Sequence, residues 1–297
     1  MASQILVPLD GSALAEQALP YAMTLARGLP AELVLFRSVS LPSDVKGILD
    51  DTADEPLEQL ETEANDYLRK VAGQFEEAGL RAYAVVRHRP AAEAIVDYSN
   101  QADIRQIVMS THGYSGISRW RHGSVAERVL QSANVPVLLV RAQRSKDAAP
   151  VPACRRILVP LDGSALAEQV LPPVVALAQA FDAEMVLFQV AIVHTSGSFT
   201  GEWYLPLQGI LETARQDAQA YLNRVADSLK GDGFKVSTAM RVGAVADSIV
   251  DHAQINHIDL IAMCTHGRTG LARWTLGSVA DRVLRAGHVP LLLVRAR

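Results

Sequence analysis

Short apolar runs alternate along this chain with longer segments in which apolar residues recur every three or four positions. The runs lie at residues 5–9, 32–39, 81–87, 106–110 and 135–141. Each is too short for a typical helix, and a short apolar run between turn residues is typical of a buried strand. The first half of the chain is therefore predicted to contain five strands.

Helical periodicity fills the segments between these runs. Apolar residues form a stripe over residues 13–27 that ends at Gly28, and shorter helices are predicted over residues 91–100 and 124–132. Pro20 interrupts the first stripe, and because an interior proline removes a backbone hydrogen bond, we expect a kink or a late start there. A long amphipathic helix ends at Gly79, and its predicted buried face is Leu57, Leu60, Ala64, Leu68, Val71, Phe75 and Ala78.

Strands that alternate with helices indicate βαβ units around a parallel sheet. Connections of this kind are right-handed in nearly all known cases. The pattern therefore predicts the α/β class.

The same pattern occurs twice in the chain. The stretch ILVPLDGSALAEQ at residues 5–17 returns unchanged at residues 157–169, an offset of 152 positions. Residues 111–130 return with few changes at 265–284, an offset of 154 positions. A repeat of this length is a whole domain rather than a solenoid unit. The second copy has therefore gained two residues after its second strand.

A polar stretch with two prolines separates the copies and is typical of a linker. The predicted organisation is a first domain at residues 1–142, a linker at 143–154 and a second domain at 155–297.

Composition narrows the class of protein. Hydrophobic residues make up 49% and charged residues 20%, and the net charge is −4. This balance gives no electrostatic reason to expect nucleic acid or an anionic membrane as a partner. The two cysteines, Cys154 and Cys264, lie far apart and outside any metal-ligand spacing. With no signal-peptide pattern and no apolar run long enough to span a bilayer, we expect a cytoplasmic protein.

Two loops are candidates for binding, because ligands of open parallel sheets lie beyond the carboxyl ends of the strands. The first loop contains Asp10, Gly11 and Ser12. Asp10 could accept hydrogen bonds from the sugar or base of a nucleotide, whereas Asp10 or Ser12 could equally cap the following helix. Taken alone, this loop favours the helix cap.

The second loop has glycines at 113, 116 and 123, followed by Ser124 at a predicted helix start. Glycines let backbone N–H groups approach an anion, and a helix start adds unpaired donors and a partial positive charge. The loop lacks the lysine of a Walker A motif and is not a dinucleotide fingerprint. Phosphate binding and an ordinary flexible turn both remain open.

With both loops considered, the chain resembles the universal stress protein family, with its UspA domain present twice. Members that bind ATP carry Gly-x2-Gly-x9-Gly-Ser/Thr after the fourth strand and an aspartate after the first. Gly113 and Gly123-Ser124 match this motif in the first copy, and Gly267 and Gly277-Ser278 match it in the second. The first glycine of the motif is replaced by Ser110 and Cys264, and the residue after the second glycine is Tyr114 or Arg268.

The resemblance implies two doubly wound domains, each a five-stranded parallel sheet in the order 3-2-1-4-5. It also implies pairing of the copies through their fifth strands, with further homodimerisation open. The implied ligand is an adenine nucleotide, ATP, with Mg2+ as an optional bridge between phosphate oxygens and no metal ligand from protein side chains. The implied nucleotide-binding residues are Pro8, Asp10, Ser38, Ser110, Gly113, Gly123, Ser124 and Val125 in the first copy. Those of the second copy are Pro160, Asp162, Val190, Cys264, Gly267, Gly277, Ser278 and Val279.

Three functions follow from this resemblance. The first is an ATP-binding regulatory protein of the stress response that acts through nucleotide occupancy. The second is a slow ATPase or phosphotransferase on the same cleft, although the sequence lacks a lysine that would grip phosphate and a recognisable base. The third is an interaction module that no longer binds nucleotide, which Ser110 and Cys264 leave open.

Overall fold

The computed structural model describes residues 3–40, 54–101, 103–111, 124–141, 154–191, 204–265 and 276–296. It divides into two compact units, Met1–Pro152 and Ala153–Arg297. The predicted linker lies almost wholly outside the described residues, so its bounds stay a prediction.

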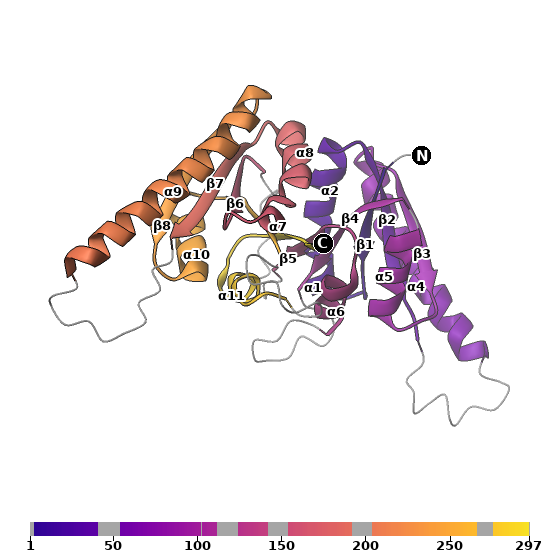
Figure 1. Cartoon of the computed structure of the whole chain (residues 1–297). Coiled ribbons are helices and arrows are strands. Elements are labelled where there is room, and N and C mark those ends of the chain that lie inside the picture. Colours follow the sequence, from indigo (N-terminus) through magenta and orange to yellow (C-terminus); the bar gives the residue numbers. More distant parts are fainter. Residues whose placement is uncertain are drawn as a thin grey trace. The chain divides into compact units, whose positions relative to one another are not determined.

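The first unit is a parallel sheet with strand order β3-β2-β1-β4-β5 (Figure 1). This order is the one that the resemblance implies. Its elements are β1 (Ser3–Pro8), α1 (Ala13–Glu16), α2 (Leu19–Gly28), β2 (Ala31–Ser38), α4 (Asp54–Glu77), β3 (Ala82–Arg87), α5 (Ala91–Gln101), β4 (Ile104–Ser110), α6 (Ser124–Ser132) and β5 (Val137–Val140).

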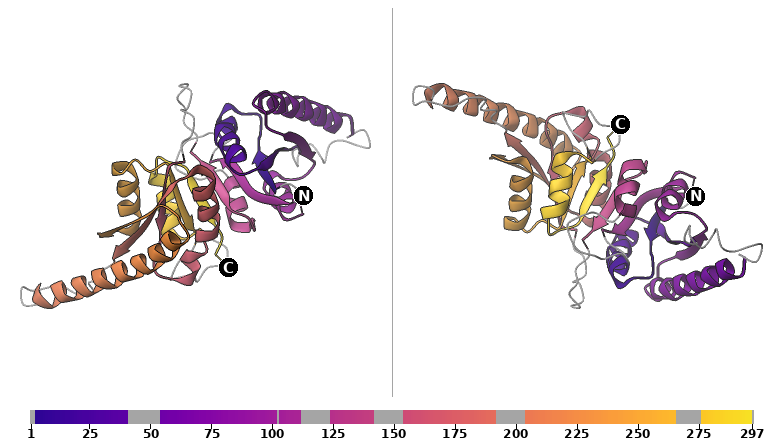
Figure 2. Two further views of the ribbon diagram at one scale, coloured as in Figure 1. Left: turned by 90° about the horizontal axis from the view of Figure 1, so that it is seen from above. Right: turned by 90° about the horizontal axis from the view of Figure 1, so that it is seen from below.

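The second unit repeats this topology with the order β10-β9-β6-β7-β8. Figure 2 shows its strands lying between the long helix α9 and the shorter helix α10. The predicted α/β class with two doubly wound units is thus confirmed. The elements are β6 (Arg156–Pro160), α7 (Ala165–Glu168), α8 (Leu171–Phe181), β7 (Glu184–Ala191), α9 (Tyr204–Gly231), β8 (Val236–Val242), α10 (Val245–Ile255), β9 (Leu260–Cys264), α11 (Ser278–Ala286) and β10 (Leu291–Val294).

The helical stripe after the first strand is two helices rather than one. Helix α1 ends at Glu16 and α2 begins at Leu19, so that Pro20 falls in the first turn of α2. A proline in the first turn removes no hydrogen bond within the helix, because those N–H groups have no helical partner. Pro172 and Pro173 stand in the first turn of α8 in the same way. The interruption predicted from Pro20 is therefore resolved by a new helix start.

The long helix α4 packs its apolar stripe on the sheet, with one exception. Ala64, Leu68 and Phe75 are fully buried, whereas Leu60 is 36% exposed. The prediction that Leu60 belongs to the buried face was wrong. The helix of 24 residues is about 36 Å long, and a strand of six residues such as β3 spans about 20 Å. The first turns of α4 therefore extend beyond the sheet that would cover them.

The two extra residues of the second copy can be placed by equivalent contacts. Tyr67 donates a hydrogen bond to Glu16, and Tyr221 donates one to Glu168. The glutamates are 152 positions apart and the tyrosines are 154 apart. The insertion thus lies in the connection that ends in α4 or α9. In the part of the chain that the structure describes, no helix is long and apolar enough to cross a membrane.

Buried His252 makes the stability of the chain sensitive to pH. The residue lies on α10 with 7% of its surface exposed, and its ring is 4.6 Å from the ring of Phe188. Burial lowers the pKa of His252, and the positive charges of Arg241 and Arg156 lower it further. The folded chain therefore holds this imidazole in its neutral form to lower pH than the unfolded chain does.

We expect the free energy of unfolding to fall as pH drops below about 6.5, the pKa of an unperturbed histidine. Above that pH this contribution is complete, and below it the unfolded chain takes up the proton first, at a slope of up to about 1.4 kcal/mol per pH unit. Urea unfolding over about pH 5 to 8 would measure the slope. His252→Tyr should reduce it, since the equivalent Tyr98 already packs on Phe36. An unchanged slope in this variant would show that other groups cause it.

Candidate functional site

Those predicted site residues that the structure describes at the strand ends lie at the carboxyl edge of the sheet in each unit. Strand β1 pairs with β2 on one side and with β4 on the other. Pro8, Ser38 and Ser110 are the last residues of these three strands, and Asp10 follows β1. Since parallel strands end at the same edge, these residues share one end of the sheet.

The second unit brings the equivalent residues together in the same way. Strand β6 pairs with β7 and with β9. Pro160 and Cys264 end β6 and β9, Val190 is next to last in β7, and Asp162 follows β6. The two edges therefore have the same arrangement of strand ends.

Asp10 and Ser12 have separate roles in the turn after β1. The Ser12 N–H donates to Asp10 Oδ1 at 2.9 Å, and Ser12 Oγ accepts from the Ala15 N–H at 3.1 Å. Ser12 is thus the N-cap of α1, and the carboxylate of Asp10 closes the turn before it. Gly11 has φ +87°, a conformation that glycine adopts readily. The helix-cap interpretation holds for Ser12 rather than for Asp10.

The turn of the second unit repeats this geometry. The backbone N–H and the hydroxyl of Ser164 both donate to Asp162 Oδ1, at 3.0 and 2.6 Å, and Ser164 caps α7. These bonds fix the direction of a partly exposed carboxylate at the strand end. Each unit therefore presents an oriented acceptor at this edge.

Tyrosine and glutamate side chains form a second polar feature near this turn, which the sequence analysis missed. Tyr67 on α4 donates to Glu16 on α1 at 2.9 Å, and the Arg37 guanidinium lies 5.2 Å from the Tyr67 ring centre. Burial and the bond to Glu16 raise the pKa of Tyr67. The hydroxyl therefore stays a donor at neutral pH. Recurrence of Tyr and Glu at equivalent positions in both copies was the available signal.

The start of α11 is held at the end of β9 in the second unit. The Gly277 N–H donates to the carbonyl oxygen of Thr265 at 2.9 Å, and Thr265 follows the last residue of β9. Gly277 is the N-cap and makes no side-chain cap. Ser278 and Val279 are the first two residues of the helix, where N–H groups have no partner within the helix. Donors that suit an anion thus lie beside the strand next to β6.

Some predicted residues lie outside the part that is described. Gly113, Gly123 and Gly267 belong to this group, as does the side chain of Ser124. Val125 is described and lies half-buried in the first turn of α6. The glycine-rich loops before α6 and α11 therefore stay predictions.

Ser110 and Cys264, which replace the first glycine of the motif, are both buried at their strand ends. The Cys264 thiol donates to the carbonyl oxygen of Ala167 on α7 at 3.5 Å. Burial, with the negative charge of Asp162 as a smaller cause, raises the pKa of Cys264 to about 12. The thiol is protonated at neutral pH, so Cys264 is a packing residue rather than a nucleophile.

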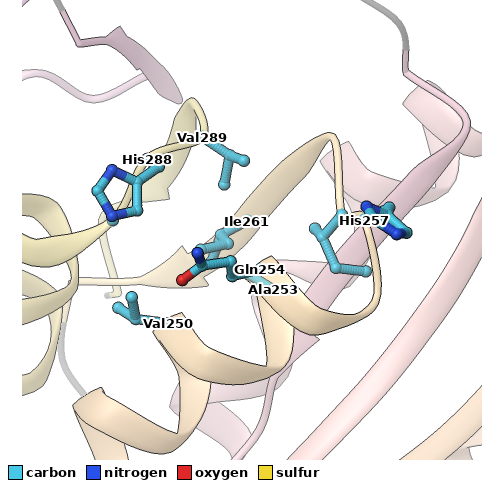
Figure 3. A pocket seen from close by; sticks show the side chains of 9 residues that line it. Val250, Ala253, Gln254, His257, Ile261, His288 and Val289 are labelled. Carbon is cyan, nitrogen blue, oxygen red and sulfur yellow. The ribbon is translucent and has the colours of Figure 1, made fainter.

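A depression of about 240 Å³ in the second unit lies at the amino ends of the strands, opposite the candidate site (Figure 3). It is bounded by α10, the start of β9 and the turn before β10, with Gln254, His257 and His288 as its polar lining. In the first unit, Asn134 at the position of His288 donates to Asn100 at the position of Gln254, at 2.9 Å. This depression contains none of the predicted nucleotide-binding residues. Within the described ranges, no three His, Cys, Asp or Glu side chains form a metal-binding group.

Comparisons with known proteins agree on one family. The model of the universal stress protein family matches residues 1–141 and 153–295. Universal stress protein MJ0531 of Methanocaldococcus jannaschii is 36% identical over 145 residues, which cover 48% of this chain and 82% of that protein. Universal stress protein Slr1230 of Synechocystis is 25% identical over 318 residues and covers 98% of this chain and 99% of its own. A crystal structure of a universal stress protein from Archaeoglobus fulgidus has a TM-score of 0.73 at 21% identity over 99% of both chains, which supports the fold.

Proposed function

This chain belongs to the universal stress protein family, and we propose that each of its two units binds an adenine nucleotide, ATP in particular. Occupancy of the sites would serve regulation in the stress response rather than rapid turnover. The observation that carries the proposal is in the second unit. Asp162 follows β6, and the start of α11 is tied to the end of the adjacent strand β9.

These two features suit the two ends of a nucleotide. The oriented carboxylate of Asp162 is an acceptor for ribose hydroxyl or adenine amino groups. The first turn of α11 offers N–H donors and a partial positive charge for phosphates. Pro160 and Val190, at the ends of β6 and β7, would line the base. Mg2+ would bridge phosphate oxygens rather than use a protein carboxylate.

The first unit would bind through the equivalent residues. Asp10 has the same turn geometry as Asp162. The Ser38 hydroxyl donates to the carbonyl oxygen of Arg89. The base pocket of the first unit would therefore be more polar than that of the second unit, where Val190 takes the place of Ser38. Gly113, Gly123 and Ser124 would hold the phosphates, as Gly267, Gly277 and Ser278 would in the second unit.

The assembly proposed for this chain follows from the resemblance. The copies would pair through β5 and β10, whose sequences VLLV and LLLV are almost the same. Further homodimerisation and a cytoplasmic location are proposals of the same kind.

The test is to identify nucleotide carried by the protein. The full chain, incubated with ATP and desalted, is denatured, and the released small molecules are identified by mass. We expect adenine nucleotide from the wild type and much less from the matched double variant Asp10→Asn with Asp162→Asn, which keeps an acceptor oxygen in each turn. Release of no nucleotide from the wild type would overturn the proposal.

A further inference from the structure

The two units differ at one position beside the aspartate turn. Phe36 and Phe188 are equivalent, because each pairs with the last proline of the first strand and accepts a 2.8 Å hydrogen bond from the residue after it. The next residue is Arg37 in the first unit and Gln189 in the second. An arginine is charged at every accessible pH, whereas a glutamine is neutral. The two strand ends therefore differ by a full charge.

The Arg37 guanidinium lies close to the turn that carries Asp10. A Cβ atom placed on Gly11 would be 3.3, 3.4 and 3.5 Å from its Nη1, Nη2 and Cζ atoms. The Tyr67 ring centre lies 5.2 Å from the same group. The guanidinium thus stacks on Tyr67 and lies close to the turn that carries Asp10, and the side chain is half-buried.

The carboxylates of Asp10 and Glu16 and the guanidinium of Arg37 all act electrostatically on Tyr67, but no close ion pair joins them in the described part of the chain. No carboxylate there forms an ion pair with Arg37, and no acceptor there receives a hydrogen bond from its guanidinium. Its planar fork matches two oxygens of a phosphate group. A phosphate attached close to whatever Asp10 binds would therefore meet this donor set.

Gln189 presents a neutral amide where Arg37 presents a charged guanidinium. Its Oε1 atom is buried and accepts no hydrogen bond from the residues that the structure describes. A buried acceptor without a partner is costly, and a hydroxyl donor from a ligand would relieve that cost. The amide oxygen cannot bond to a phosphate oxygen, since both are acceptors, and the neutral amide N–H₂ group is a weaker donor to phosphate than a guanidinium.

We propose that Arg37 and Gln189 are specificity-determining residues, so that the first unit prefers a nucleotide with an additional phosphate on its ribose and the second prefers free ribose hydroxyls. The inference rests on the proposed function and takes the ribose, rather than the adenine, as the group that Asp10 and Asp162 bind. Dinucleotide-binding folds distinguish ligands with and without a ribose phosphate in a comparable way. An acidic residue binds the free ribose hydroxyl, whereas a nearby arginine accommodates the ribose phosphate.

The experiment compares two probes that differ only by the ribose phosphate. Adenosine 5′-monophosphate and adenosine 3′,5′-bisphosphate are titrated into the full chain by calorimetry, with wild type, Arg37→Gln and Gln189→Arg. We expect Arg37→Gln to weaken binding of the bisphosphate at least about tenfold, because hydrogen bonds to charged groups are the stronger kind, and to leave the monophosphate almost unchanged. Gln189→Arg should strengthen binding of the bisphosphate. Arg81→Gln is the matched control, since that side chain is 79% exposed and precedes β3 at the other edge of the sheet.

The outcomes separate this inference from the proposed function. If ATP binds but Arg37→Gln leaves the ratio of the two affinities unchanged, the specificity assignment is wrong and nucleotide binding stands. If the wild type binds neither ATP nor the two probes, the proposed function fails and this inference fails with it. Gln189→Arg places a charge where an atom is buried, so its thermal unfolding is measured first. Arg37→Gln decides the question by itself if the other variant does not fold.

Discussion

Gly277→Val should weaken ATP binding by the second unit at least about tenfold, which corresponds to about 1.4 kcal/mol. Gly277 is the N-cap of α11, and its N–H is bonded to Thr265 at the end of β9. A branched side chain at this position would crowd the N–H groups of the first turn, where the phosphates are proposed to lie. Calorimetry with ATP on the Asp10→Asn background, in which the first unit is weakened, would measure the effect.

The fold should tolerate this change. Gly277 has φ −60° and ψ 147°, a conformation open to any residue. Gly231→Val is a suitable control, because a Cβ atom at Gly231 would meet nothing within 4 Å. Equal ATP affinity in the Gly277→Val and Gly231→Val chains would show that the start of α11 does not hold the phosphates.

Phe188→Ala should lower the free energy of unfolding by about 3–5 kcal/mol. Phe188 lies in the middle of β7 with none of its surface exposed, and its ring packs on His252. Removal of the ring leaves a cavity between the sheet and α10 that its neighbours cannot fill without strain. Urea unfolding monitored by circular dichroism would measure the loss.

An exposed aromatic residue on a strand supplies the control. Tyr83 on β3 is 45% exposed, and Tyr83→Ala should change the free energy of unfolding by about 0.5 kcal/mol or less. A similar loss in both variants would mean that burial of Phe188 in this core is not what stabilises β7.

The order of the elements could be predicted because each rests on a local pattern. The helix over residues 124–132 has the bounds of α6, and the other strands and helices of the first unit agree within a few residues. Two predictions were wrong in detail. The stripe over residues 13–27 is divided into two helices, the second of which has Pro20 in its first turn. Leu60 is exposed rather than buried, on a part of α4 that extends beyond the sheet.

Only some residues of the candidate site could be identified from the sequence. Asp10 and Asp162 could be identified because each follows a strand end directly, within an identical stretch. The contact of Arg37 with Tyr67 could not, because the two residues meet across 30 positions through the placement of α4 on the sheet. Local periodicity carries no information about which long side chains meet in this way.

The repeat also shows where sequence identity has structural consequences. The identical stretches form the same turns, with Ser12 and Ser164 as caps. At positions that differ, the local chemistry differs too: Asn134 bonds to Asn100 in the first unit, whereas Gln254 and His288 line a depression in the second. A shared fold therefore does not make the two units functionally equal.

We propose that this chain binds ATP at the carboxyl edges of its sheets. The most direct test is calorimetric titration of ATP with Mg2+ into nucleotide-free full chain, beside the double variant Asp10→Asn with Asp162→Asn. We predict saturable binding by the wild type and a loss of affinity of at least about tenfold in the double variant. The absence of saturable heat from the wild type, or equal affinity in both proteins, would contradict the account.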